Sequence, residues 1–162
     1  MEVRYNGTMT NFVRTATIDD LDYLVSWGEK LHFVEKKFEP LLTFSKKESE
    51  DFYTKQLNNP DALFLVASID NTLVGYLYAH VDKVDYLNTN KYECEIEVIY
   101  LDEKARGTGI SQELIQKCFD WIKTKDCFRV KAGIYSKNIA SQNLFAKMGF
   151  ESYHSTYTKS VV

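Results

Sequence analysis

Apolar residues recur along the chain at two spacings, and each spacing predicts a different kind of element. Steps of three and four residues mark the buried face of a helix, whereas strict alternation marks a strand with one buried face. The first helical stripe predicts a helix that begins at Thr17, with Asp20 as the partner in a capping box. The stripe consists of Leu21, Leu24, Val25, Gly28 and Leu31.

Three further helices are predicted in the same way. Ser45 and Glu48 open one that runs to about Leu57. Another runs from Asn138 to Met148, where a glycine follows and ends it. The remaining helix follows residue 109 and carries the stripe Ile110, Leu114, Ile115, Cys118, Phe119 and Ile122.

Strand signals occupy most of the rest. The run "ALFLVASIDNTLVGYLYAHV" predicts two strands joined by a tight turn at Asp70 and Asn71. A polar loop at 85–91 then leads to "YECEIEVIYL", in which even positions 92–100 are apolar and odd positions begin with three glutamates. Shorter strands are predicted at 12–15, 128–135 and the aromatic C-terminal segment 150–162.

The order of these elements predicts one domain over residues 1–162, with a loose tail at 1–11. An antiparallel front half is followed by strand–helix–strand crossovers, which is typical of a three-layer α/β/α sandwich around a mixed, mostly antiparallel sheet.

Composition narrows the functional classes. The net charge of −3 argues against nucleic acid as a partner, because phosphate binding needs a basic field. No apolar run approaches the roughly 20 residues of a membrane span, and the N-terminal residues lack the apolar core of a signal peptide. We therefore expect a cytoplasmic protein with no membrane contact. The histidines His32, His80 and His154 are scattered, so no metal site is expected.

The stretch "YLDEKARGTGISQELI" places a glycine-containing loop between a strand and a helix. The first N–H groups of a helix have no intrahelical partner and attract anions, and glycines let the backbone approach closely. The loop spacing fits neither a P-loop nor a three-glycine Rossmann fingerprint. It predicts a pyrophosphate site, although a tight turn with glycines for steric reasons alone is the alternative.

Two motifs here resemble the GNAT N-acetyltransferase superfamily, whose members transfer acetyl from acetyl-CoA to an amine. The signature Arg/Gln-x-x-Gly-x-Gly/Ala is similar to Arg106, Gly107, Thr108, Gly109, Ile110 and Ser111, with serine in the last small position. A second signature matches at Asn138, Gly149 and Phe150. It departs at Ser141, where the family has alanine, and at Phe145, where the family has tyrosine.

The resemblance implies a splayed pair of parallel strands and acetyl-CoA as co-substrate, without a metal. It implies that the loop binds the pyrophosphate, that the backbone at Ile99, Tyr100 and Leu101 contacts the pantetheine and thioester, and that Asn138 lies on the other side of the pantetheine. The positions of Ser141 and Phe145 belong to the same cofactor site.

An amine must lose a proton before it attacks a thioester, so the reaction needs a general base. Glu93, Glu95, Glu97 and Ile99 would share one strand face, where repulsion between carboxylates raises a pKa. Glu97 is the first candidate for the base and Glu95 the second. A salt-bridged face, with Arg129 and Lys131 as partners, is the structural alternative.

Phe145 cannot donate a proton to the leaving thiolate, which either departs unassisted or receives its proton from another hydroxyl. Tyr135 and Ser141 are the candidates for that donor.

The acceptor pocket of the family lies over the first two helices and the C-terminal strands. Aromatic and acidic residues there suit an organic cation, although a peptide amine stays open. The candidate residues are Trp27, Phe33, Glu35, Phe38 and Tyr153. A non-catalytic acetyl-CoA sensor, a longer acyl donor and a homodimer also remain open.

Overall fold

The computed structural model describes residues 10–84, 91–159 and 161, and shows a five-stranded sheet in the order β1-β2-β3-β4-β5. Neighbouring strands are antiparallel from β1 to β4, whereas β4 and β5 are parallel. The sheet is therefore mixed, as predicted. The strands are β1 (Asn11–Thr15), β2 (Ala62–Ile69), β3 (Thr72–Lys83), β4 (Tyr92–Leu101) and β5 (Cys127–Lys131).

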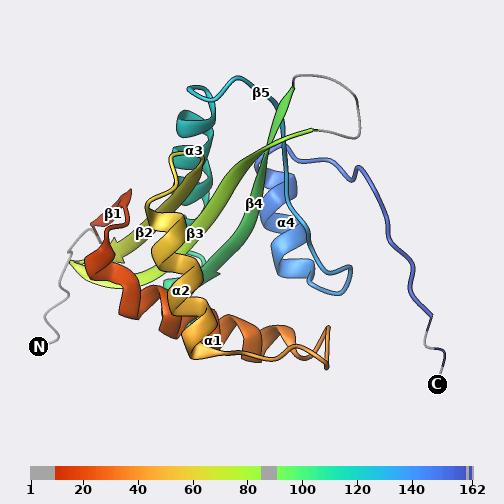
Figure 1. Cartoon of the computed structure of the whole chain (residues 1–162), viewed down its shortest axis with the longest axis horizontal. Coiled ribbons are helices and arrows are strands. Elements are labelled where there is room, and N and C mark those ends of the chain that lie inside the picture. The colour runs from red at the N-terminus through yellow and green to blue at the C-terminus, as the bar shows by residue number, and fades with distance from the viewer. Residues whose placement is uncertain (1–9, 85–90, 160, 162) are drawn as a thin grey trace, which may run out of the picture.

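Helices cover both faces of this sheet and complete the predicted three-layer sandwich (Figure 1). On one face lie α1 (Leu21–Glu35) and α2 (Lys46–Leu57), and on the other lie α3 (Ile110–Ile122) and α4 (Ile139–Lys147). Two 3-10 turns, Ile18–Asp20 and Glu103–Ala105, precede α1 and α3. No helix of the described chain is long and apolar enough to cross a membrane.

The predicted caps and turns are present. The carboxylate of Asp20 accepts a hydrogen bond from the backbone N–H of Thr17 at 2.8 Å, and the Ser45 hydroxyl accepts one from the N–H of Glu48 at 3.4 Å. Asp70 and Asn71 join β2 to β3 with φ of 49° and 63°, the left-handed conformation that a two-residue hairpin requires.

Each face of the sheet has its own apolar core, because alternate strand residues point to opposite sides. The core under α3 and α4 includes Leu77, Ile96 and Leu114, and the helical stripe of α3 is buried as predicted. The core under α1 and α2 is aromatic and contains Trp27 and Tyr76, whose rings stack at 5.8 Å.

Gly28 lets α1 and α2 approach each other closely. A Cβ at this position would lie 2.6 Å from the hydroxyl oxygen of Tyr53 on α2. That hydroxyl shares a buried 3.1 Å hydrogen bond with the hydroxyl of Tyr76 on β3. The glycine therefore permits a three-element contact that also forms one wall of the larger cavity described below.

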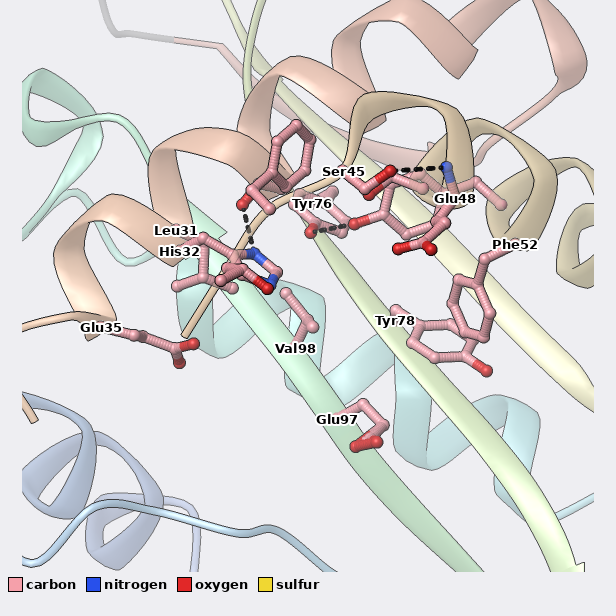
Figure 2. A pocket seen from close by; sticks show the side chains of 15 residues that line it. Leu31, His32, Glu35, Ser45, Glu48, Phe52, Tyr76, Tyr78, Glu97 and Val98 are labelled. Atoms are coloured by element: carbon pink, nitrogen blue, oxygen red, sulfur yellow. Dashed lines mark hydrogen bonds between the residues drawn. The ribbon is translucent and has the colours of Figure 1, made fainter. Parts of the chain in front are cut away.

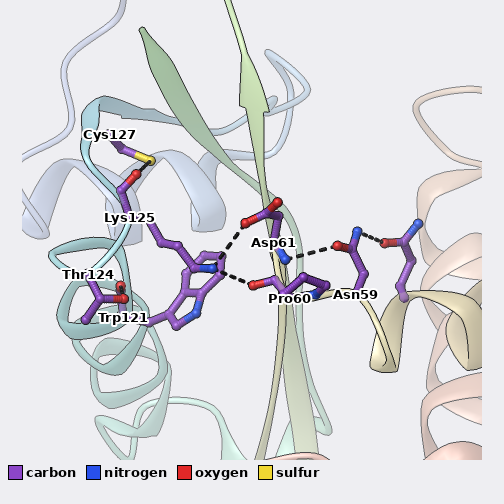
Figure 3. Close-up of polar contacts among 8 residues, drawn as sticks. Asn59, Pro60, Asp61, Trp121, Thr124, Lys125 and Cys127 are labelled. Carbon is purple, nitrogen blue, oxygen red and sulfur yellow. Dashed lines mark hydrogen bonds and ion pairs between the residues drawn. The ribbon is translucent and has the colours of Figure 1, made fainter.

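Lys125 joins the turn after α3 to the turn before β2 (Figure 3). Its ammonium donates to the Pro60 carbonyl at 2.5 Å and to the Asp61 carboxylate at 3.1 Å, and lies 5.3 Å from the Trp121 ring centroid. These contacts hold together the two turns that lead into β2 and β5.

Two predicted strands differ from the structure. The segment predicted as a strand at 128–135 pairs only as far as Lys131, because β5 leaves β4 there. The C-terminal strand is absent from the described residues: 151–159 carry no strand pairing and run away from the domain (Figure 1). A strand-like aromatic composition does not by itself form a strand: Tyr153 contacts Arg129 of the edge strand β5, but the segment forms no backbone ladder with it. Of the tail predicted at 1–11, residues 1–9 lie outside the described residues, and Asn11 already pairs in β1, so the prediction is wrong there. Most of the loop predicted at 85–91 also lies outside the described residues.

Candidate active site

The loop of the first motif connects β4 to α3 through the 3-10 turn at Glu103–Ala105. Gly107 and Gly109 have φ of +77° and +87°, a conformation that residues with a Cβ rarely adopt. No atom lies within 4 Å of a Cβ placed on Gly107, so the backbone conformation rather than crowding requires glycine there.

Buried residues anchor both ends of this loop, Ala105 before it and Ile110 after it. The Thr108 hydroxyl donates to the Ala105 carbonyl at 2.7 Å, which closes the loop internally. Arg106 is exposed and lies 4.0 Å from Glu103. The described contacts provide no acceptor for the backbone N–H groups of residues 107–111. Consecutive unpaired amides at a helix start are what an anion such as a pyrophosphate needs.

The parallel strands β4 and β5 separate before β4 reaches this loop. Their pairing ends at Glu95 and Lys131. The residues that follow each strand's last paired residue enclose a cavity of about 60 Å³, here called the gap cavity. One wall consists of β4 residues 96–99 and another of residues 132–135. Asn138, Ser141 and Phe145 of the α4 region form the third wall. The splayed pair of parallel strands that the resemblance implies is therefore present.

Ile99, Tyr100 and Leu101 pair with β3 on one edge and have no β5 partner on the other. Of the three, Ile99 lines the gap cavity, and the open strand edge suits hydrogen bonds to an extended ligand. The Tyr100 side chain points away from the gap into the aromatic core, where its hydroxyl donates to Asp102 at 3.1 Å.

The second motif supplies a cap and a packing residue. The side-chain carbonyl of Asn138 accepts a hydrogen bond from the N–H of Ser141 at 3.2 Å and begins α4. Phe145 is 4% exposed and makes an edge contact with Phe150 at 5.0 Å. Its ring therefore belongs to the core and also lines the gap cavity.

A larger cavity of about 380 Å³ lies between the helices α1 and α2 and the strands β3 and β4 (Figure 2). Its walls carry aromatic and acidic side chains. They include His32, Glu35, Phe44, Glu48, Phe52 and Tyr78.

The larger cavity and the gap cavity meet, because they share Leu31 and Glu35 of α1 and Glu97 and Val98 of β4. A ligand in the gap and a ligand in the larger cavity would touch at this junction. Two carboxylates, those of Glu35 and Glu97, flank it. Burial raises the pKa of Glu35, and the nearby His32 opposes that shift.

A β-bulge in β4 lies at Glu97 and brings Val98 to the same side of the sheet at this junction. Tyr78 of β3 pairs with Val98 and Ala79 pairs with Ile96, so Glu97 is the extra residue. In a bulge, two residues oppose one and the alternation shifts by one position beyond it. The prediction that Ile99 shares the glutamate face is wrong for this reason: Ile99 packs into the core under α3, whereas Glu97 and Val98 both line the larger cavity.

Glu93 and Glu95 are committed to ion pairs. Glu93 is 5% exposed and receives Arg129 at 2.6 Å and Lys131 at 2.8 Å, while Lys131 also contacts Glu95 at 3.0 Å. Burial alone would raise the pKa of Glu93, but hydrogen bonds and charge from Lys131 and Arg129 outweigh it and lower that pKa. Glu93 is therefore not the carboxylate whose pKa repulsion raises, and the structural alternative of a salt-bridged face holds for Glu93 and Glu95.

The predicted acceptor residues fall into different places. Glu35 lines both cavities, and Phe38 stacks on Tyr135 at 5.2 Å beside the gap. Trp27 is 3% exposed and lines neither cavity, because it packs inside the aromatic core. Phe33 is 80% exposed and also lines neither cavity. Tyr153 is 78% exposed and lies under the Arg129 guanidinium at 4.8 Å, outside the cavities.

Tyr135, the predicted donor, lines the gap cavity. Burial raises its pKa, and the negative charges of Glu35 and Glu39 raise it further. The phenol is therefore protonated at neutral pH and able to donate a hydrogen bond.

Several residues of the larger cavity were missed by sequence reasoning, and His32 and Glu48 are the two with an imidazole or carboxylate side chain. His32 has Nδ1 2.9 Å from the carbonyl oxygen of Gly28, one helical turn back, which favours a proton on Nδ1 and a lone pair on Nε2. Glu48 also lines this cavity, although the sequence indicated only its position in a helix cap. His32 follows Gly28 by four residues and precedes Glu35 by three. This helical spacing could have indicated that the three residues lie on the same face of α1.

Comparison with known proteins gives a consistent picture. A model of the acetyltransferase (GNAT) family matches residues 26–150. An uncharacterised N-acetyltransferase of Methanocaldococcus jannaschii is 29% identical over 153 residues, which cover 93% of this chain and 65% of that protein. An aminoglycoside N(6′)-acetyltransferase of Serratia marcescens is 29% identical over 93 residues, or 54% of this chain and 60% of that protein.

The chain spans less than two thirds of the length of the curated relatives that it matches. Among solved structures, a predicted acetyltransferase of Clostridium acetobutylicum crystallised with acetyl-CoA superposes with a TM-score of 0.76. It is 17% identical, and the match covers 94% of this chain and 97% of that one. At this identity the likeness supports the fold.

Proposed function

Because the chain belongs to the GNAT acetyltransferase family, we propose that it transfers the acetyl group of acetyl-CoA to a primary amine, by direct attack with both substrates bound. The observation that carries this proposal is the junction of the two cavities at Leu31, Glu35, Glu97 and Val98. A gap for a thioester and a pocket for an acceptor meet there, beside two carboxylates.

The chain's own residues fit acetyl-CoA at two points. The unpaired N–H groups of residues 107–111 suit its pyrophosphate, and the open edge of β4 beyond Glu95 suits its amide-containing arm. When bound, acetyl-CoA supplies an acetyl group activated as a thioester. The overall reaction joins the acceptor nitrogen to the acetyl carbon, breaks the carbon–sulfur bond and yields the free thiol, the acetylated amine and one proton.

Glu97 is the proposed general base. It lies at the junction, and no described side chain pairs with it, whereas Lys131 occupies Glu95 at 3.0 Å. Glu97 can therefore take the ammonium proton, directly or through water, without first breaking an ion pair. Glu95 then has a structural role, because its ion pair with Lys131 links β4 to β5. Tyr135, on the opposite wall of the gap, is the proposed donor to the departing sulfur.

The test is a screen of primary amines with acetyl-CoA, in which release of free thiol is followed and the acetylated amine is identified by mass spectrometry. We expect thiol release that depends on the acceptor. Thermal stabilisation by acetyl-CoA without release by any acceptor would instead identify a non-catalytic acetyl-CoA-binding module.

A further inference from the structure

The larger cavity carries more negative charge than proton transfer requires. Carboxylates enter it from three different elements: Glu35 from α1, Glu48 from α2 and Glu97 from β4 (Figure 2). Among the described residues of its lining, His32 is the only basic side chain, and no lysine or arginine is present. No described cation lies within ion-pair distance of these three carboxylates, although such pairs occur elsewhere in the chain.

Glu48 differs from the other two in its place. It lines the larger cavity but not the gap, so it lies away from the junction where transfer would occur. Its backbone is fixed in the first turn of α2 by the hydrogen bond to Ser45. Figure 2 shows its carboxylate directed from α2 toward Phe52 and Tyr78, across the cavity from Glu35.

Aromatic walls accompany this carboxylate. The rings of Phe52 and Tyr78 meet edge to face at 5.6 Å, and Phe44 meets His32 in the same manner at 5.3 Å. Ring faces attract organic cations, and most strongly where the cation is partly desolvated. Carboxylate and ring faces together form a receptor for an ammonium group rather than for a neutral or anionic one.

We propose that Glu48 is a specificity-determining residue that selects acceptors with a second ammonium group, so that the substrates are diamines or larger polyamines. This inference rests on the proposed function. The reacting amine must become neutral at the junction, and therefore it cannot neutralise a carboxylate at the far end. A second ammonium on the same molecule can pair with Glu48 and hold the first amine at the junction. A monoamine leaves Glu48 without a partner.

The experiment compares acceptors that differ in one charge. Butylamine and 1,4-diaminobutane share a carbon skeleton, and both are measured as acceptors with acetyl-CoA in the wild-type protein and in Glu48→Gln. We expect the wild type to prefer the diamine by about tenfold or more in kcat/KM, the scale of one charge-assisted hydrogen bond. Glu48→Gln should reduce the diamine to the level of butylamine, through KM, and leave butylamine unchanged.

Glu50→Gln is the matched control, because Glu50 lies two residues along α2 and pairs with Lys46 at 3.7 Å outside the cavity. It should change neither acceptor. Spermidine, a linear polyamine, and neamine, an aminoglycoside, both carry several ammonium groups. Whichever of them shows a higher kcat/KM than butylamine that is lost in Glu48→Gln identifies the class of polyamine that the cavity binds.

Calorimetric binding of the same amines in the presence of coenzyme A separates this inference from the proposed function. Diamine binding that weakens about tenfold in Glu48→Gln supports the inference even where no thiol is released. Equal binding and equal turnover of butylamine and 1,4-diaminobutane by the wild type would overturn it. So would a loss in Glu48→Gln that is the same for both amines.

Discussion

Val98 lies beside Glu97 because β4 carries a single extra residue. Without the bulge opposite Tyr78, the strand beyond Glu97 would keep its alternation, and Val98 would point into the core under α3. With it, Glu97 and Val98 both face the larger cavity. Glu93 and Glu95, on the same strand, pair with Lys131 of β5, so identical side chains have different surroundings.

Replacing Glu97 with glutamine should lower kcat by about 10²-fold or more at neutral pH, because the amide keeps the shape but accepts no proton. The acidic limb of the pH–rate profile should flatten, while acetyl-CoA affinity stays unchanged. The pH–rate profile is measured by steady-state thiol release, and the affinity for acetyl-CoA by calorimetry.

Two variants control that result. Glu95→Gln should leave the pH profile in place and lower thermal stability, since it breaks the pair with Lys131. If His32→Gln removes the acidic limb and Glu97→Gln does not, the base is His32 of α1 and the assignment to β4 is wrong.

At the scale of elements, the connection from β4 to α3 combines two glycines at positive φ with the proposed coenzyme A site. Gly109→Val places a β-branched residue at φ of +87°, a conformation that such residues avoid, and should therefore change the backbone conformation of the loop. We expect the thermal stabilisation by coenzyme A to disappear in this variant, measured as the shift in Tm on adding the ligand.

Gly149→Val is the matched control, because Gly149 has φ of +86° but ends α4 rather than the loop. Both variants should lose stability in the absence of ligand. Only Gly109→Val should lose the response to coenzyme A, and a full response in that variant would remove the loop from the binding site.

The contact of α1 with α2 allows a second test at this scale. Gly28→Ala should lower the free energy of unfolding by roughly 1–3 kcal/mol, because the new methyl overlaps the Tyr53 hydroxyl oxygen, which lies 2.6 Å from the Cβ position. Tyr53→Phe removes that oxygen and its bond to Tyr76. In chemical denaturation the double variant should be more stable than the two single losses predict; strict additivity would show that the overlap is absent.

At the scale of the whole molecule, two buried carboxylates connect stability to acid. The Arg14 guanidinium, hydrogen-bonded to Asp20 at 2.7 Å and 2.8 Å, lowers the pKa of Asp20, and the cations of β5 lower that of Glu93. A depressed pKa stabilises the fold fully above the unfolded-state value, about 3.9 for Asp and 4.3 for Glu. This stabilisation is lost as pH falls through the lower folded value.

Urea denaturation between pH 7 and pH 3 measures this dependence. Asp20→Asn and Glu93→Gln should each be less stable at pH 7 and should lose less stability than the wild type as pH falls below about 4. Glu50→Gln, which alters an exposed pair, should follow the wild-type curve. Parallel curves for Glu93→Gln and the wild type would contradict the role of Glu93.

The sequence by itself determined the elements whose signals are local. Helical stripes such as Leu114 to Cys118, the caps at Thr17 and Ser45, the hairpin at Asp70 and Asn71, and the glycines of the loop all follow from propensity and dihedral preference. These features require no knowledge of distant contacts. The order of elements then led to the mixed three-layer sandwich.

Only the tertiary structure decided which side chains meet. Whether Trp27 lines a pocket or fills a core depends on Tyr76, about fifty residues away along the chain, and the sequence carries no signal of that pairing. The bulge at Glu97 arises from the register between β3 and β4, and the end of β5 at Lys131 from its divergence from β4. Glu35, Glu48 and Glu97 line one cavity because α1, α2 and β4 pack against one another there. Long-range packing, rather than local conformational preference, decides which side chains of these elements face the cavity.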